Sequence, residues 1–194
     1  MSPFTHLVGS WLVASVTTHN PRDRKLVTWA GVVPDADGLG AVVDVIGSWM
    51  TGKECMFYYY QTYHHLLLHG WPAALVVSLL LSGFARERFR VLFWCLIVFH
   101  LHLACDLLGS RGPDTTDLWP ICYSEPLLRH PIWFWKGQWR LDGWQNRLVF
   151  LGLFSTAIWL TLKRGYSFVE VISQRADAVF VLVLRGWRDR LQKR

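Results

Sequence analysis

The stretch VLFWCLIVFHLHLACDLL, residues Val91–Leu108, decides the fold class because it is a long apolar run that ends in polar side chains. A helix needs about 20 apolar residues to cross a hydrocarbon core of about 30 Å, and this run approaches that length. Two further runs, Leu66–Phe84 and Leu148–Leu162, have the same character. The segments Phe4–Val16 and Leu26–Val33 are too short to cross alone, and we expect them to pair as a helical hairpin around an Asn-Pro turn. The sequence therefore predicts an all-α, polytopic membrane bundle of short and full-length helices.

The composition favours a membrane protein. Hydrophobic residues make up 52% of the 194 residues and charged residues only 18%, whereas a soluble domain carries about 25% charged residues. The net charge is +6, and the basic residues lie at the ends of apolar runs instead of on one polar face. This distribution favours an anionic membrane surface as the partner and argues against nucleic acid.

The basic residues also indicate an orientation and a division of the chain. Three basic clusters follow or precede apolar runs, so an up-down bundle places them at one end, which the positive-inside rule makes cytoplasmic. The polar and aromatic segment Gly109–Asn146 then forms a long extracytoplasmic loop region. We expect a membrane-embedded bundle at residues 1–165 and a basic amphipathic C-terminal helix on the membrane surface at residues 166–194. The three clusters are Arg22, Arg24 and Lys25; Arg86, Arg88 and Arg90; and Lys163 and Arg164.

Histidine and aspartate side chains collect at the opposite ends of the expected helices. Alternating helix directions should bring them together on the extracytoplasmic side, and imidazole with carboxylate is a ligand set for zinc, with manganese or iron as alternatives. His102 and Asp106 lie four residues apart and share one helix face. His64 and His69 lie five apart at the start of the third run and converge only if its first turn is irregular. The predicted metal ligands are His6, Asp35, Asp37, His64, His69, His102 and Asp106.

The remaining histidines and the cysteines have simpler interpretations. We expect His19 and His130 to be interfacial or hydrogen-bonded, and His100 to pack on a different helix face from His102. His65 is either an outer partner of the ligands or a stacking residue. The aromatic run MFYYYQTY, residues 56–63, is interpreted as interfacial before it is interpreted as a lipid-access groove. The cysteines lack CxxC spacing, and a Cys55–Cys122 disulfide and free thiols remain equal alternatives.

The order of these motifs resembles the LexA-regulated, membrane-bound, metal-dependent hydrolases, which are inner-membrane proteins of bacteria and archaea. The resemblance runs from about residue 5 to residue 125 and departs from the family in its third motif, H-R-G-x-T-H-S. Here HHLLLHG keeps the two histidines and replaces the other residues by His65, Leu66, Leu68 and Gly70. If the missing arginine holds an anionic group of the substrate, we expect Arg111 or Lys53 to replace it. The matching motifs are Thr5-His6, Pro34-Asp35-Ala36-Asp37, His64 with His69, His102 with Asp106, and Leu118-Trp119-Pro120.

Motifs and resemblance together predict a membrane-embedded metal-dependent hydrolase of a lipid or lipid-linked phosphoester, with an analogy to phospholipase C. The seven ligands exceed the four of a tetrahedral zinc, so one or two ions are compatible with them. Asp114, Asp117 and Glu125 are candidates for the general base or an outer partner, and Arg111 is a candidate phosphate ligand or a solvated charge. The competing hypotheses are a non-catalytic metal-binding or transport protein and a structural protein that a metal holds together. The substrate, the metal and the oligomeric state do not follow from the sequence.

Overall fold

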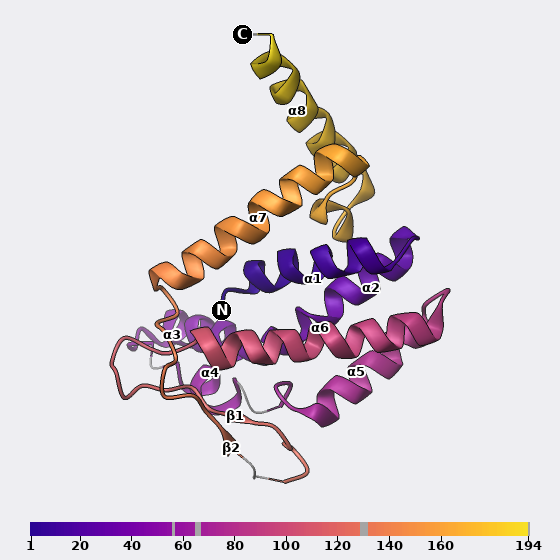
Figure 1. Cartoon of the computed structure of the whole chain (residues 1–194). Helices are drawn as coiled ribbons and strands as arrows, with labels where there is room; N and C mark the ends of the chain where they lie inside the picture. Colours follow the sequence, from indigo (N-terminus) through magenta and orange to yellow (C-terminus); the bar gives the residue numbers. More distant parts are fainter. Residues whose placement is uncertain (56, 65–66, 129–131, 194) are drawn as a thin grey trace.

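The computed structural model describes residues 1–55, 57–64, 67–128 and 132–193, which are mostly helical (Figure 1). The predicted all-α architecture holds for most of this part, apart from an antiparallel ribbon of two short strands, β1 (Ile121–Cys122) and β2 (Ile132–Trp133). The α-helices are α1 (Pro3–Thr17), α2 (Pro21–Ala30), α3 (Gly40–Thr51), α4 (Tyr58–Tyr63), α5 (Trp71–Gly83), α6 (Arg88–Gly109), α7 (Trp144–Arg164) and α8 (Gln174–Gln192), and the 3-10 helices are η1 (Val33–Leu39) and η2 (Phe168–Val171).

Helices α1 and α2 form the expected hairpin, and both pack on α6 (Figure 1). Asn20 ends the turn: its side chain accepts a hydrogen bond from the backbone N–H of Asp23 at 3.0 Å, and Pro21 occupies the first helical position, where no N–H is needed. The hairpin closes tightly at Gly31, since a Cβ there would lie 1.9 Å from Ser10 Oγ. A glycine is therefore required where α2 ends beside α1.

The predicted membrane spans are only partly reproduced. Within the described residues, α6 is long and apolar enough to cross a bilayer, and α2 with η1 and α3 makes a second span only if the two parts, bent by 51°, count as one. The expected run Leu66–Phe84 becomes the shorter α5, because residues 67–70 are not helical and Pro72 allows the helix to start only at Trp71. The expected run Leu148–Leu162 lies in α7, but the polar residues at the start of that helix keep its hydropathy below that of a span. A polytopic topology therefore stays a prediction.

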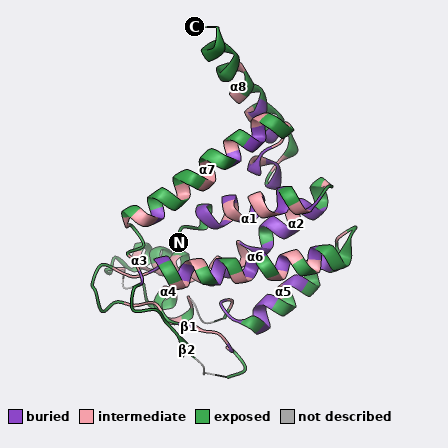
Figure 2. Ribbon diagram, viewed as in Figure 1, coloured by how far each residue is buried: buried purple, intermediate pink, exposed green. Residues whose placement is uncertain are grey.

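Three clusters of buried apolar side chains hold the helices together. The buried residues are spread over the inward-facing parts of the helices, whereas most of α8 is exposed (Figure 2). The first cluster joins α1 and α7 to η2, the second joins α1 and α2 to α6, and the third joins α5 and α6 to β1. Trp11 and Phe99 are the largest of their fully buried side chains. Because each cluster involves α1 or α6, these two helices form the frame on which the others are arranged.

Arg24, a member of the first basic cluster, is buried, with 3% of its surface exposed. Its guanidinium donates from Nε to Glu170 Oε1 and from Nη2 to Glu170 Oε2 at 2.7 Å, and it lies 3.9 Å from the centre of the Tyr166 ring. Trp11 Nε1 donates to the same carboxylate at 3.2 Å. The sequence alone does not show that η2 brings a carboxylate back to this part of the chain.

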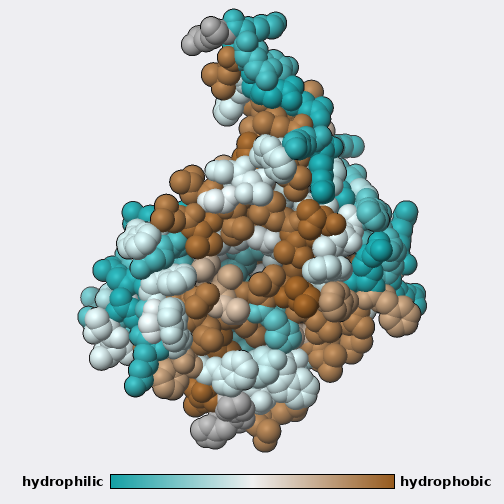
Figure 3. Space-filling model, in the orientation of Figure 1, coloured by the Kyte–Doolittle hydropathy of each residue, from teal (hydrophilic) through white to brown (hydrophobic). Residues whose placement is uncertain are grey.

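Helix α8 extends away from the other helices and exposes apolar side chains, including Val179, Leu182 and Trp187 (Figures 1 and 3). Helix α3 likewise exposes Trp49 and Met50. Apolar residues also cover much of the middle of the face in Figure 3. Contact of α8 with a membrane surface and the division at residue 165 remain predictions.

The segment after α6 is anchored by two buried amides. Gln138 donates to the carbonyl of Asp106 at 3.0 Å and accepts from the N–H of Trp119 at 2.9 Å. Asn146 donates to the carbonyl of Gly109 at 2.8 Å. These bonds hold the Leu-Trp-Pro segment beside the end of α6. Among the described residues the four cysteines are free thiols, so the Cys55–Cys122 alternative of a disulfide is not realised.

Candidate metal centre

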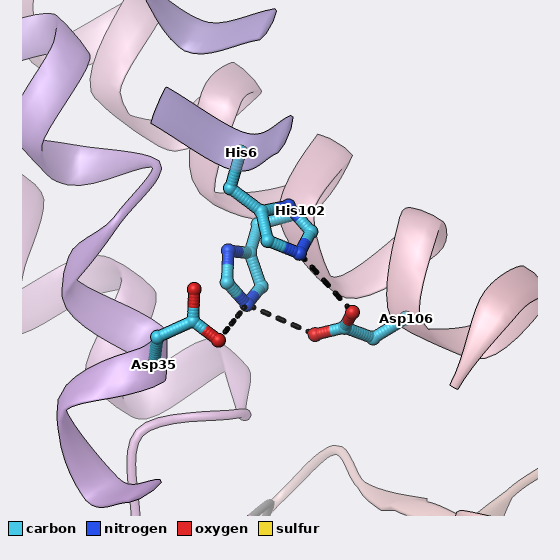
Figure 4. Close-up of side chains that lie close together, drawn as sticks. All are labelled: His6, Asp35, His102 and Asp106. Carbon is cyan, nitrogen blue, oxygen red and sulfur yellow. Dashed lines mark hydrogen bonds and ion pairs between the residues drawn. The ribbon is translucent and has the colours of Figure 1, made fainter. Parts of the chain in front are cut away.

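The structure brings the seven side chains predicted as metal ligands into one buried network. Four of them form a group whose ligand atoms lie within 4.8 Å of one another, and the other three form a second such group. They come from α1, η1, the connection between α4 and α5, and α6. The first group is His6, Asp35, His102 and Asp106, shown in Figure 4, and the second is Asp37, His64 and His69.

Asp106 is the centre of the first group, and its side chain is 2% exposed. Its Oδ1 lies 3.2 Å from His6 Nε2 and its Oδ2 lies 3.0 Å from His102 Nε2 (Figure 4). Ser110 donates to Oδ1 at 3.1 Å, and the amino group of Met1 also donates to Oδ1. A buried carboxylate whose two oxygens contact imidazoles and an amine is well placed to bind a cation.

The His102 ring is oriented by a backbone carbonyl. Its Nδ1 lies 2.9 Å from the oxygen of Gly31, and since a carbonyl can only accept, Nδ1 carries the proton. The other ring nitrogen, Nε2, faces Asp106 and lies 3.8 Å from Asp35 Oδ1, and in the neutral tautomer it carries the lone pair. The His6 ring stacks on the His102 ring with centroids 3.7 Å apart. A hydrogen bond from one ring nitrogen to a backbone carbonyl, with the other nitrogen directed into the site, is the usual arrangement of a metal-binding histidine.

His69 joins the two groups. Its Nδ1 lies 2.9 Å from Asp37 Oδ2, while its Nε2 lies 3.4 Å from His102 Nε2 and 3.5 Å from Asp106 Oδ2. Asp37 also accepts from His64 Nδ1 at 2.7 Å through its other oxygen. His64 directly follows α4, and His69 lies in residues 67–70, which are not helical; this arrangement lets residues five apart converge on one carboxylate. We expected both histidines to lie at the start of the third apolar helix, but α5 begins only at Trp71.

Asp35 has a carboxylate oxygen without a partner. Its Oδ2 is buried and accepts no hydrogen bond from any residue that the structure describes, and its side chain is 14% exposed. Together with Asp37 and Asp106 it places three carboxylates in a buried site. An uncompensated buried charge costs several kcal/mol. The donor set therefore fits a divalent cation, which would use the free oxygen and neutralise the excess negative charge.

The same electrostatics affect individual side chains. Burial alone would lower the pKa of His69, but hydrogen bonds to Asp106 and Asp37 outweigh it and raise the pKa to about 9. Burial lowers the pKa of His6, against the opposing hydrogen bond to Asp106. Burial and the charges of Asp35, Asp106 and Asp37 raise the pKa of Tyr60 to about 12, so its hydroxyl stays protonated.

A cavity of about 400 Å³ opens beside the network and reaches both groups through Asp35, Asp106 and His64. Its other walls are mainly apolar or aromatic and include Tyr60 and Trp119. A second cavity of about 280 Å³ shares His64 and Trp119 and also contains Asp117. The network is therefore accessible from a space large enough for part of a small molecule.

The four predicted catalytic residues do not gather around the network. Asp117 is exposed but shares the second cavity with His64. Arg111 lines a different cavity of about 530 Å³, and its Nη1 donates to the carbonyl of Asp114 at 2.9 Å. Glu125 is half-buried and follows β1. Asp114 is exposed, and so is Lys53, the other base expected to bind an anionic group, which lies between α3 and α4. Their catalytic roles remain predictions.

The other histidines behave as ordinary structural residues where they are described. His100 packs as expected, with Nδ1 2.8 Å from the carbonyl of Leu96 and Nε2 2.8 Å from the Tyr123 hydroxyl. His65 and His130 lie outside the described residues. The sequence interpretation missed Tyr60, which stacks on His64 with centroids 4.6 Å apart. Its position four residues before His64 was the available signal.

The model of the YdjM inner membrane protein family matches residues 1–174, so it covers nearly the whole chain. The chain belongs to this family. It is the LexA-regulated, membrane-bound, metal-dependent hydrolase family that the motifs predicted. The match continues past residue 125, where the predicted resemblance ended, and includes α7 and η2. The protein is therefore an inner membrane protein with two buried His/Asp groups able to hold metal. No curated protein and no solved structure matches the chain.

Proposed function

We propose that this YdjM-family protein is a metal-dependent hydrolase that cleaves the phosphoester bond of a lipid or a lipid-linked molecule. The observation that carries the proposal is the convergence of four imidazoles and three carboxylates, one with an unpartnered buried oxygen, beside a cavity. A purely structural polar cluster satisfies its own hydrogen bonds. This one leaves a buried acceptor, Asp35 Oδ2, without a hydrogen bond from the described residues.

The first group would hold the first ion, through His6, Asp35, His102 and Asp106, with His69 Nε2 directed at it. The second group would orient His69 or hold a second ion, which makes one or two ions per chain. The oxygen and nitrogen donors suit Zn²⁺, Mn²⁺ or Fe²⁺. When bound, such an ion supplies Lewis acidity, which polarises a phosphoryl oxygen and makes water a better nucleophile.

The side chains around the ligands have supporting roles. With a metal in place of the Nε2 proton of His69, Gly31 and Asp37 would hold the Nδ1 protons of His102 and His69, so that both rings would direct their Nε2 lone pairs toward the site. Asp117 is retained as the candidate proton acceptor, because it shares a cavity with His64. Arg111 is less suited to the role of phosphate ligand, since it lines another cavity.

A lipid substrate is supported by the walls of the 400 Å³ cavity. The apolar side chains of Pro3, Leu39 and Leu141 line it together with the polar groups. The family is an inner membrane family, which places the protein where such amphiphiles occur. The volume suits a headgroup and the start of a chain, because ligand sites commonly measure about 300–1,000 Å³.

The test is turnover by the purified protein in detergent micelles after reconstitution with Zn²⁺ or Mn²⁺. A panel of phospholipids and lipid-linked phosphoesters should include at least one substrate whose cleavage is lost in the chelated protein. The His69→Ala variant should lose both the metal and the hydrolysis. Hydrolysis that persists in metal-free His69→Ala protein would refute the proposal.

The alternative is a metal-binding protein without turnover, whether a transporter or a structural site. A transporter needs acidic groups along a path, but Asp23 accepts hydrogen bonds from the backbone N–H groups of Arg86 and Glu87, and Glu170 is paired with Arg24. Both carboxylates are thus already used in holding the helices together. Stoichiometric metal with no cleavage of any member of the panel would favour the alternative.

A further inference from the structure

The third family motif leaves an open question in this chain. The arginine of the motif is replaced by His65, and the two bases expected to replace it lie elsewhere. Arg111 lines another cavity, and Lys53 is exposed in the α3–α4 connection. If a phosphoester binds in the cavity beside the two groups, as the proposed function requires, some other side chain has to bind its anionic part.

Tyr60 is the side chain whose position fits this task. It lines the 400 Å³ cavity together with Asp35, Asp106 and His64. Its ring is held by stacking on His64 and by the Trp119 ring, whose centroid is 5.7 Å away. No described residue forms a hydrogen bond with its hydroxyl, which leaves an O–H donor available to a ligand.

The backbone fixes where this ring lies. The carboxylate of Asp44 accepts from the N–H groups of Tyr59 and Tyr60 at 3.0 and 2.9 Å, which ties the start of α4 to α3. Gly40 lets α3 approach, since a Cβ there would lie 2.8 Å from the carbonyl carbon of Tyr59. Gly38 leaves room for the rings of His64 and Tyr60, because a Cβ added at this position would lie 3.1 Å from His64 Nδ1. The Tyr60 ring is therefore held in place before any ligand binds.

We infer that Tyr60 is the substrate-binding residue that replaces the missing arginine, with its hydroxyl donating a hydrogen bond to an anionic phosphoryl oxygen in the cavity. The inference rests on the proposed function for the class of substrate. A neutral donor is compatible with an acidic cavity when the metal supplies the positive charge. It follows that phosphate binds after the metal and not before, because three carboxylates repel an anion in the metal-free site.

The experiment is calorimetric titration of inorganic phosphate into zinc-loaded protein in micelles, after free zinc has been removed. Tyr60→Phe keeps the ring and deletes the hydroxyl, and Tyr59→Phe is the matched control on the same helix. We expect Tyr60→Phe to weaken phosphate binding about 10- to 100-fold, as for one hydrogen bond to a charged group. Its zinc content and unfolding temperature should equal those of the unaltered protein. Tyr59→Phe should bind phosphate normally, and chelated protein should bind none.

Three results would overturn the inference: equal phosphate affinity in Tyr60→Phe, loss of zinc from Tyr60→Phe, or absence of phosphate binding by the zinc-loaded protein. The proposed function fails separately. If the protein hydrolyses no phosphoester but binds phosphate in the pattern described, Tyr60 is a ligand-binding residue of a non-catalytic site. If it hydrolyses a phosphoester equally well with Tyr60→Phe, the function stands and the role of Tyr60 does not.

Discussion

At the scale of single residues, Asp106 has the most consequential position. Two imidazoles, a serine hydroxyl and the Met1 amine all contact it, although it lies in the helix that is apolar enough to cross a membrane. A carboxylate in such a place is costly unless it binds a cation, so its presence implies a function.

The change Asp106→Asn tests this residue. The amide keeps the shape but removes the charge and one acceptor, so we expect the purified variant to lose at least 10-fold in metal affinity. Elemental analysis after gel filtration measures the metal retained. The control is Asp189→Asn, an exposed aspartate paired with Arg188 on α8, which should retain normal metal. Full metal content in Asp106→Asn would contradict the assignment.

Residue types and spacing predicted part of the site. His102 and Asp106 were recognisable because four residues separate neighbours on a helix face. The joining role of His69 was not, since it depends on an irregular connection that places Nδ1 and Nε2 toward different partners. The position of Tyr60 was missed because an aromatic run before an apolar segment is equally typical of a membrane interface.

At the scale of elements, the close contact of α1 and α2 at Gly31 positions the centre. The carbonyl of Gly31 holds His102, and the absence of a side chain lets Ser10 approach. Val91–Leu108 was predicted well as α6, since its apolar run has no breaker. The start of α5 was misplaced because the structure-breaking effect of residues 67–70 depends on contacts with Asp37.

We expect Gly31→Ala to lower the free energy of unfolding by about 1–3 kcal/mol and to weaken metal binding, because the added methyl group separates α1 from α2. Gly47→Ala is the matched control. Nothing lies within 4 Å of a Cβ at that position inside α3, so it should stabilise the helix by about 0.5–1 kcal/mol. Thermal unfolding in micelles compares the two variants. If Gly31→Ala had the stability and metal affinity of the unaltered protein, the close approach of α1 and α2 would not be required.

The second test of elements concerns the link between α2 and η2. Glu170→Gln leaves the Arg24 guanidinium buried without its charged partner and should cost about 3–5 kcal/mol of stability. Glu87→Gln breaks an exposed pair with Arg90, 43% exposed on both sides, and should cost at most about 1 kcal/mol. Metal content should be normal in both folded variants. Equal stability of the two would mean that the buried pair does not hold the C-terminal segment.

At the scale of the whole molecule, the account depends on which side of the membrane the centre faces. Family membership makes the chain an inner membrane protein, while the side follows only from the predicted orientation of the basic clusters. Burial of Arg24 removes one member of those clusters, and the others are unaffected. Topology cannot be predicted further from sequence, since α5 and α7 fall short of clear spans.

Cysteine labelling in intact cells tests the orientation. In a variant without native cysteines, Thr115→Cys lies in the exposed segment after α6, and Arg188→Cys lies on α8. A maleimide that does not cross membranes should label position 115 in intact cells and position 188 only after permeabilisation. The reverse pattern would place the centre on the cytoplasmic side.

The central claim is that the network of His6, Asp35, Asp37, His64, His69, His102 and Asp106 binds a metal ion. X-ray absorption at the metal edge, on protein purified without added metal, tests it most directly. The account predicts a first-row metal with only nitrogen and oxygen neighbours at about 2.0–2.2 Å. A protein without metal, or a metal with sulfur neighbours at about 2.3 Å from the free cysteines, would contradict it.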